Sequence, residues 1–286
     1  ITYDRTKPRN AVPDTLDAEI VKDGARFFEE GEKMQLSYAV RNTHRTIGTR
    51  ASSHIVRKFG MNNGLQADHL TVKLTGSCGQ SLGAFAVNGL KIEVQGDAND
   101  YVGKGLSGGL IVVRPQMSSP LKAEENTIIG NTVLYGATAG HLFAAGRAGE
   151  RFAVRNSGAS VVVEGCGSNG CEYMTGGVAV ILGRIGANFG AGMTGGMAYV
   201  YDPSGVAEDF INLEGVVTCA VSHPHWEAQL RGLIERHVAE TGSRHGARIL
   251  AEWASERANF LQICPKEMLR LIPYPLSDEA QKVPAE

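Results

Sequence analysis

Cys166 and Cys171 are the first residues whose type and spacing suggest chemistry, because paired thiols bind metal ions and iron–sulfur clusters. Their spacing is CxxxxC, no second pair lies nearby, and no histidine is close in the sequence. Cysteine is also a small side chain that is readily buried. We therefore predict that both cysteines are core residues and that neither binds a metal.

Two glycine patterns match the dinucleotide-binding motif GxGxxG. They are formed by Gly103, Gly105 and Gly108 and by Gly165, Gly167 and Gly170. That motif requires a strand, a turn and then a helix whose N-terminus meets the pyrophosphate. The segments that follow, GLIVVRP from Gly109 and GVAVILG from Gly177, are typical of strands. We therefore expect structural turns and no nucleotide site at either match.

The other polar residues that could form a site also have simpler structural roles. GQSLG from Gly79 is not GxSxG, and the strand-to-helix turn of a nucleophilic serine is missing there. His223 and His225 flank Pro224 at a helix start, where capping or exposed residues are expected. Six carboxylates are placed near corners where solvation is expected: Glu93, Asp97, Asp100, Glu150, Glu164 and Glu172. We predict no catalytic, cofactor-binding or metal-binding residue in the chain.

Arginines recur through the same region, at Arg114, Arg147, Arg151, Arg155 and Arg184. The sequence leaves two interpretations open. They form a face that binds a partner, or they are scattered surface charges.

Composition excludes several classes of protein. The net charge of −2 gives no support for binding to nucleic acid or to anionic membranes. No apolar run reaches the 18 residues of a membrane span, and no signal peptide is visible. The five cysteines are an odd number at irregular spacings, which favours reduced thiols in the cytoplasm. The opening ITYDRTKPRN reads like the interior of a longer polypeptide.

A glycine-rich repeat is what must position all of these residues. Apolar segments that follow small-residue corners return every 18 to 20 residues between His69 and Asp202. One interval, from Gly108 to Gly140, is 32 residues long because of an insertion at residues 114–126, which we expect to be an exposed loop. Such a period indicates one structural unit per repeat, and each unit needs neighbours to bury its apolar side.

A repeat of about 19 residues suits a coil of short strands, at roughly 3.3 Å per residue. We expect an all-β core, a single-stranded right-handed β-helix of about seven coils with capping helices at both ends. A jelly roll or flattened sandwich is the alternative. Alternate side chains would point into the coil and stack there: Val112, Leu142, Val162, Val180 and Tyr199.

The flanking segments predict caps. Apolar periodicity predicts a helix from Asp14 or Thr15 to Gly31, a strand over 34–40 and a helix over 48–59. After the repeats we expect a strand over 215–221, a helix from Ser222 that ends near Gly242, and a second helix from about Ser243. The whole chain, 1–286, is predicted to be one domain: an N-terminal cap (1–64), the repeats (65–204), and a C-terminal strand with helices (205–286).

Long stretches of the sequence resemble a known family. They include GQSLGAFAVNGLKIEVQGDANDYVGKGLSGGLIVVRP from Gly79, NTIIGNTVLYGATAGHLFAAG from Asn126 and GERFAVRNSGASVVVEGCGSNGCEYMTGG from Gly149. These resemble the GXGXG domain at the C-terminal end of bacterial glutamate synthase large (alpha) subunits. The similarity extends to PRNAVPDTLDAEIV and CPKEMLRL, so it covers almost the whole chain.

The resemblance implies a β-helix in a polypeptide about five times as long, well beyond the size of one domain. Family members carry an amidotransferase domain, and an FMN-binding barrel with a 3Fe–4S cluster. They make glutamate from glutamine and 2-oxoglutarate, with electrons from NADPH through a small FAD-containing subunit. No residue here matches the family's nucleophilic cysteine, its FMN-binding stretch or its cluster ligands.

The resemblance therefore implies a non-catalytic scaffold with no cofactor of its own. Its partners would be the amidotransferase and FMN domains, the small subunit and, in the whole enzyme, further copies. Two alternatives remain. One is a cofactor-binding protein that uses its glycine corners as an anion nest, and the other is a free-standing β-helix subunit.

Overall fold

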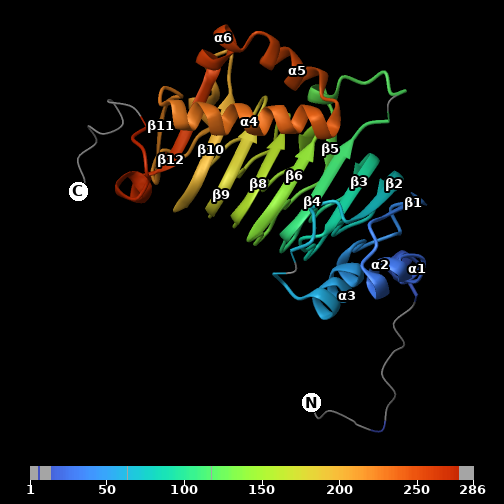
Figure 1. Ribbon diagram of the computed structural model, residues 1–286. Helices are drawn as coiled ribbons and strands as arrows, with labels where there is room; N and C mark the ends of the chain where they lie inside the picture. The colour runs from blue at the N-terminus through green and yellow to red at the C-terminus, as the bar shows by residue number, and fades with distance from the viewer. Residues whose placement is uncertain (1–5, 7–13, 63, 117, 277–286) are drawn as a thin grey trace.

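The computed structural model describes residues 6, 14–62, 64–116 and 118–276. Its framework is one mixed, mostly parallel sheet of twelve strands (Figure 1). The main path follows the order β1-β2-β3-β4-β6-β8-β9-β10-β12-β11. Those strands are β1 (Met34–Val40), β2 (Leu70–Cys78), β3 (Leu90–Ala98), β4 (Ser107–Arg114), β6 (Ala139–Ala144), β8 (Ser157–Val163), β9 (Thr175–Ile181), β10 (Gly195–Tyr201), β12 (Phe260–Pro265) and β11 (Val216–Ala220).

Neighbouring strands are parallel from β1 to β10, and β12 is antiparallel to both β10 and β11. Two short strands lie off the main path: β5 (Thr127–Ile129) pairs with β3 and with β7 (Arg147–Ala148). The seven strands predicted from the repeat, β2, β3, β4, β6, β8, β9 and β10, are all present.

Helices gather at the β1 end of the sheet and over one face (Figure 1). They are α1 (Leu16–Asp23), α2 (Ala25–Glu30), α3 (Thr49–Phe59), α4 (Pro224–Thr241), α5 (Arg244–Ala251) and α6 (Trp253–Glu256), with 3-10 turns η1 (Ala123–Glu125), η2 (Ala207–Phe210), η3 (Arg257–Asn259) and η4 (Lys266–Arg270). Figure 1 shows α4 lying across the strands and α1 to α3 at the β1 end.

The predicted all-β, single-stranded β-helix is wrong. Each repeat contributes one strand to a common sheet, and most of the remaining residues of the repeat form turns and not further long strands. Helix α4 packs against β4, β6, β8 and β9, so helices form part of the core. The architecture is α/β. The glycine period correctly predicted the repeated unit, but it could not show what covers each face of the sheet.

The sheet has an apolar layer on each side. One layer packs the strands against the turn segments and against α1 to α3, through residues such as Ile20, Ile55, Leu134 and Phe152. The other packs them against α4 and α5, through Leu230, Ile234 and Ile249 among others, and includes Phe260 of β12. Because side chains alternate along a strand, each central strand contributes side chains to both layers.

One register detail corrects the predicted stack of inward side chains. Val112, Val162, Val180 and Tyr199 do form a row across the sheet, and the row faces α4. Its member on β6 is Phe143 and not Leu142, which pairs with Ile111 and faces the turns.

The flanks agree with the pattern of the sequence, with two exceptions. The predicted first helix is broken at Gly24 into α1 and α2, and it ends at Gly31, which is left-handed with φ 77°. Gly242 ends α4 in the same way with φ 69°. Strand β12 was not predicted, although it inserts between β10 and β11. Apart from Thr6, the outer parts of the predicted caps, 1–13 and 277–286, lie outside the described residues.

Candidate functional sites

Both suspected thiols lie in the turn-side core. Cys166 and Cys171 are 1% and 0% exposed, and burial raises the pKa of Cys166 to about 12. All five cysteines are free thiols. A thiol with so high a pKa is a poor ligand and a poor nucleophile. The prediction that this pair is buried core is confirmed.

The two GxGxxG matches form turns between strands. Gly103 and Gly105 lie between β3 and β4, and the second match lies between β8 and β9. Each match is followed by a strand, so neither provides the helix N-terminus that a pyrophosphate needs. The backbone N–H groups of Gly103 and Gly105 donate to Leu82 and Tyr135 in the adjacent turns, at 2.8 and 2.9 Å. They are therefore already used within the fold and do not form an open anion nest.

The turns share a conformation that the sequence did not reveal. In six successive turns, alternate residues have positive φ, beginning with Ser81, Gly83 and Phe85 and next with Tyr101, Gly103 and Gly105. The later sets are 132, 134 and 136; 151, 153 and 155; 169, 171 and 173; and 188, 190 and 192. Twelve of these eighteen positions are not glycine, among them Leu134, Cys171 and Tyr173, so stacking against the neighbouring turns holds them in a region that side chains disfavour.

The two histidines at the start of α4 agree with the prediction of capping or exposed residues: His223 is the N-cap, and His225 is exposed in the first turn. The His223 ring accepts a hydrogen bond from the backbone N–H of His225 at 3.1 Å. The His225 ring stacks on Tyr274, with 4.3 Å between centroids. Ser81 of GQSLG is simply the first positive-φ residue of its turn.

The arginines do not act as one set. Arg151 pairs with Glu172 at 3.0 Å, and Arg155 lies over the Tyr173 ring with 5.7 Å to its centroid. Both belong to the turn segments, and Arg155 lines a groove together with Tyr135, Tyr173 and neighbouring small residues. In contrast, the Nε of Arg147 is buried with no hydrogen-bond partner in the described structure.

One carboxylate that was predicted to be solvated is buried. Glu164 is 1% exposed and lies under α4 and α5, not in solvent. Its Oε1 accepts a short hydrogen bond from the Ser243 hydroxyl and lies 3.3 Å from His237 Nε2. Ser243 also caps α5 by accepting from the N–H of Gly246 at 2.9 Å. These three buried side chains fix the α4–α5 junction on the sheet, and because they are sealed from solvent they are unsuited to substrate chemistry.

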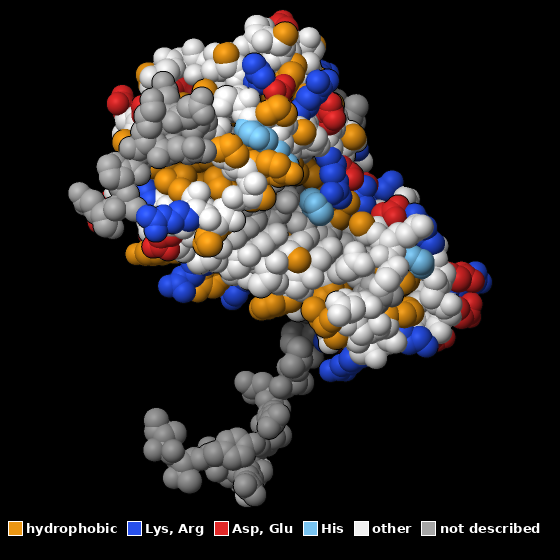
Figure 2. Space-filling model, turned by 60° about the vertical axis from the view of Figure 1, so that its left-hand side comes forward, with side chains coloured by type: hydrophobic (Ala, Val, Ile, Leu, Met, Phe, Trp, Pro, Cys, Tyr) orange, Lys and Arg blue, Asp and Glu red, His pale blue; other side chains and the backbone are white. Residues whose placement is uncertain are grey.

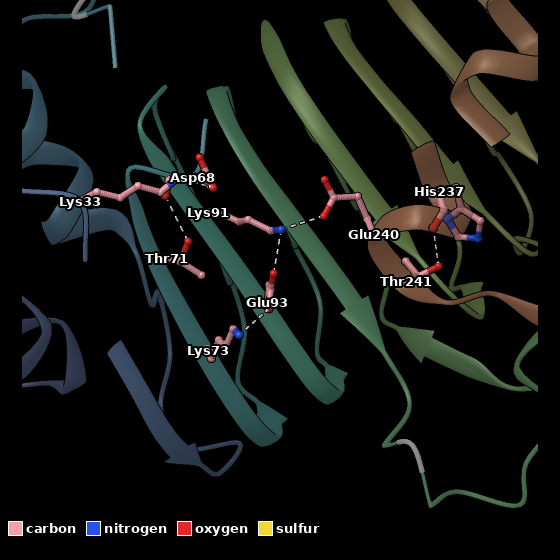
Figure 3. Close-up of polar contacts among 9 residues, drawn as sticks. All are labelled: Lys33, Asp68, Thr71, Lys73, Lys91, Glu93, His237, Glu240 and Thr241. Atoms are coloured by element: carbon pink, nitrogen blue, oxygen red, sulfur yellow. Dashed lines mark hydrogen bonds and ion pairs between the residues drawn. The ribbon is translucent and has the colours of Figure 1, made fainter. Parts of the chain in front are cut away.

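Beside this buried cluster, at the same end of α4, the sheet face is charged and open. Helix α4 ends above β3, where Lys91 lies 2.7 Å from Glu93 and 2.8 Å from Glu240 (Figure 3). Lys73 on β2 approaches Glu93 at 3.8 Å, and Lys33 pairs with Asp68 at 2.7 Å. Burial alone would lower the pKa of Lys91, but hydrogen bonds to Glu240 and Glu93 outweigh burial and raise it. We call Lys73, Lys91 and Glu93 the open polar face.

This arrangement suits recognition better than catalysis. The ion pairs hold both signs of charge in fixed positions, and the side chains of Lys73 and Glu93 are 40% and 24% exposed. The middle of the face shown in Figure 2 is a broad area of backbone and uncharged side chains, with charges of both signs around it. Among the described residues, no three His, Cys, Asp or Glu side chains are grouped as a metal site would require. Within that same part of the chain, no helix is long and apolar enough to cross a bilayer.

Comparison of sequences shows which known proteins this chain resembles. The chain is 66% identical over 274 residues to the glutamate synthase NADPH large chain of Azospirillum brasilense, which covers 96% of this chain and 18% of that protein. It is 43% identical over 246 residues to the corresponding large chain of Bacillus subtilis, covering 86% and 16%. The Schizosaccharomyces pombe protein named glutamate synthase NADH is 47% identical over 266 residues, covering 93% and 13%.

The chain thus spans less than a fifth of the length of these relatives. A family model described as GXGXG motif matches residues 17–266. The resemblance found in the sequence is confirmed, and the chain belongs to the GXGXG motif family.

Proposed function

We propose that this chain is a structural part of a glutamate synthase large chain and is not catalytic by itself. It would hold an amidotransferase domain and an FMN-binding synthase domain at a fixed separation, so that ammonia released from glutamine reaches 2-oxoglutarate. The observation that carries the proposal is the 66% identity to a glutamate synthase large chain over nearly the whole of this chain. The parallel sheet with an apolar layer on each side is a rigid support for such positioning.

The open polar face is the surface that we propose for docking one of those domains. Its charges are partly exposed and paired, so a partner can hydrogen-bond them without leaving an uncompensated charge buried. Docked domains, a small subunit with FAD and NADPH, and further copies of the large chain are all part of this proposal, as is a cytoplasmic location. The division into an N-terminal cap, repeats and a C-terminal cap also remains a proposal.

The family's FMN and 3Fe–4S cluster do not fit the residues of this chain. A cluster needs three thiolates, whereas the described cysteines come together at most in pairs, Cys166 with Cys171 and Cys264 with Cys219, and burial raises the pKa values of Cys166, Cys171 and Cys264. We therefore propose that those cofactors bind elsewhere in the large chain. An anion nest in the glycine turns, the alternative from the sequence, conflicts with the hydrogen bonds that those turns already make.

The test uses the intact large chain with charge-reversed open-face residues, Lys73→Glu together with Glu93→Lys. We expect both half-reactions, glutamine hydrolysis and ammonia-dependent glutamate formation, to continue while their coupling weakens. The readout is the amount of glutamine hydrolysed per glutamate formed, which should rise several-fold. Lys122→Glu, which changes an exposed loop lysine, is the control and should leave the ratio unchanged. A folded double variant that lost FMN or one half-reaction outright would show that this chain takes part in the chemistry.

A further inference from the structure

The outer edge of β1 leaves backbone groups without partners. Met34 N donates to the His69 carbonyl at 2.9 Å, and Met34 pairs in register with Leu70. In a parallel ladder, alternate residues turn both backbone groups to the same side. The backbone N–H and C=O groups of Leu36, Tyr38 and Val40 therefore point toward β2. Those of Gln35, Ser37 and Ala39 point away from the sheet. Among the described residues, none of those outward groups makes a hydrogen bond.

This edge lacks the usual protection against strand pairing. Natural edge strands are short, charged, bulged or interrupted by proline. Strand β1, MQLSYAV, has seven residues with no charge and no proline, and its register with β2 is continuous. The strand at the opposite edge, β11, has only five residues. In Figure 1 no described element lies beyond β1.

The side chains of β1 are also incompletely covered. Met34, Leu36 and Tyr38 are only partly buried, although they pack against the core on the turn side. The alternate residues Gln35, Ser37 and Ala39 are exposed. A further strand with apolar residues on one side and small polar residues on the other would continue both rows.

We propose that the outer edge of β1 receives a β-strand from another part of the glutamate synthase large chain. This inference rests on the proposed function, because it requires the rest of that chain. The length of the large chain indicates the occupant. The segment corresponds to 18% of the Azospirillum protein, so more than four-fifths of such a large chain is available to supply a strand. The strand is expected to alternate apolar and polar side chains over about five to seven residues.

A second copy of this chain fits the edge less well. Two β1 strands that overlap fully and antiparallel would be centred on Ser37. That register places Lys33 of each copy opposite Arg41 of the other, and like charges directly opposite are destabilising.

Hydrogen exchange on the intact large chain tests the proposal. The amides of Gln35, Ser37 and Ala39 should exchange about 100-fold or more slowly than unprotected amides, as the inward amides of Leu36 and Tyr38 do. If the three outward amides exchange freely while the inward ones stay protected, the edge is open and the proposal is wrong. Protection that disappears on dilution, together with a fall in mass by light scattering, would identify a second copy and would also overturn it.

A pair of variants separates pairing from folding. Ser37→Pro removes one outward N–H, at an edge position that proline tolerates in a sheet. It should increase exchange at Gln35 and Ala39 at least tenfold while Leu36 and Tyr38 stay protected. Ser37→Ala keeps the N–H and should match the wild type. Unchanged exchange at Gln35 and Ala39 in the proline variant would contradict the proposal. That result would not bear on the proposed function, which is tested separately by the coupling ratio of the open-face variants.

Discussion

At the scale of single residues, burial controls the ionisable groups. His141 on β6 is half-buried beside Phe143, with ring centroids 6.1 Å apart. Burial lowers the pKa of His141 to about 4, and the nearby Arg236 adds to the shift while Glu240 opposes it. The folded protein therefore keeps this ring neutral at pH values where the unfolded chain protonates it.

The sign of the resulting pH dependence follows from this lowered pKa. The unfolded chain takes up a proton near pH 6.5, and the folded chain does so only near pH 4, so the stability contributed above pH 6.5 is lost as the pH falls toward 4. We expect His141→Gln to reduce the loss of thermal stability between pH 7 and pH 4.5. Melting temperatures of both proteins at the two pH values measure the effect, and an NMR titration of His141 checks its cause. A His141 resonance that titrates near pH 6.5 in the folded protein would rule the explanation out.

Thiol reactivity gives a second prediction at the residue scale. Burial raises the pKa of Cys78, Cys166 and Cys264 to about 12, and that of Cys171 well above its usual value. Iodoacetamide at pH 8 should leave these four unmodified in the native protein, because the thiolate is the reactive form. Half-buried Cys219 should react first, and all five should react in guanidinium chloride. Peptide mass spectrometry reads out each site, and rapid native labelling of Cys166 would mean that the core opens.

At the scale of elements, the glycines that close the strands set the spacing of the sheet. Gly96 lies near the end of β3 with φ 150°, and a Cβ there would overlap the carbonyl oxygen of Gly76 on β2. Gly136 has φ 66°, but nothing lies within 4 Å of the position of its Cβ. The backbone conformation disfavours an L side chain at both positions. Only at Gly96 would a side chain also prevent the pairing of β2 with β3.

The two positions form a matched pair of variants. Gly136→Ala should cost about 1–2 kcal/mol, the price of a left-handed conformation for a residue with a Cβ. Gly96→Ala should cost more than about 3 kcal/mol, because β2 and β3 must also move apart. Chemical denaturation of both variants measures the difference. Equal costs would show that backbone conformation alone, and not the close approach of strands, selects glycine at position 96.

At the scale of the whole molecule, α4 completes the fold. Leu230 and Ile234 are fully buried against the row that contains Val112, Phe143 and Val162. Without α4 that row would form an exposed apolar strip across several strands, a feature that promotes aggregation.

We expect Leu230→Ala and Ile234→Ala to cost about 2–5 kcal/mol each. The double variant should bind a fluorescent apolar dye and aggregate, because α4 no longer covers the sheet. Arg231→Ala, on the exposed side of the same helix, should stay within about 0.5 kcal/mol of the wild type. If the double variant remains compact and does not bind the dye, the sheet is stable without its helix layer.

The sequence alone determined the features that depend on neighbouring residues. The glycine period located the seven repeated strands, and Gly31 and Gly242 located two helix ends, because local φ/ψ preferences and side-chain periodicity are written in short segments. The motifs also gave the family. The absence of a site in this chain remains a prediction.

Tertiary structure decided what distant segments do to one another. It placed α4 on the sheet and so made an α/β fold of what looked all-β, and it inserted β12 between β10 and β11. It faced Phe143 and not Leu142 toward α4, and it buried Glu164 with His237 and Ser243. These outcomes depend on contacts between residues far apart in sequence, such as the 73 positions between Glu164 and His237, and no local pattern specifies such contacts.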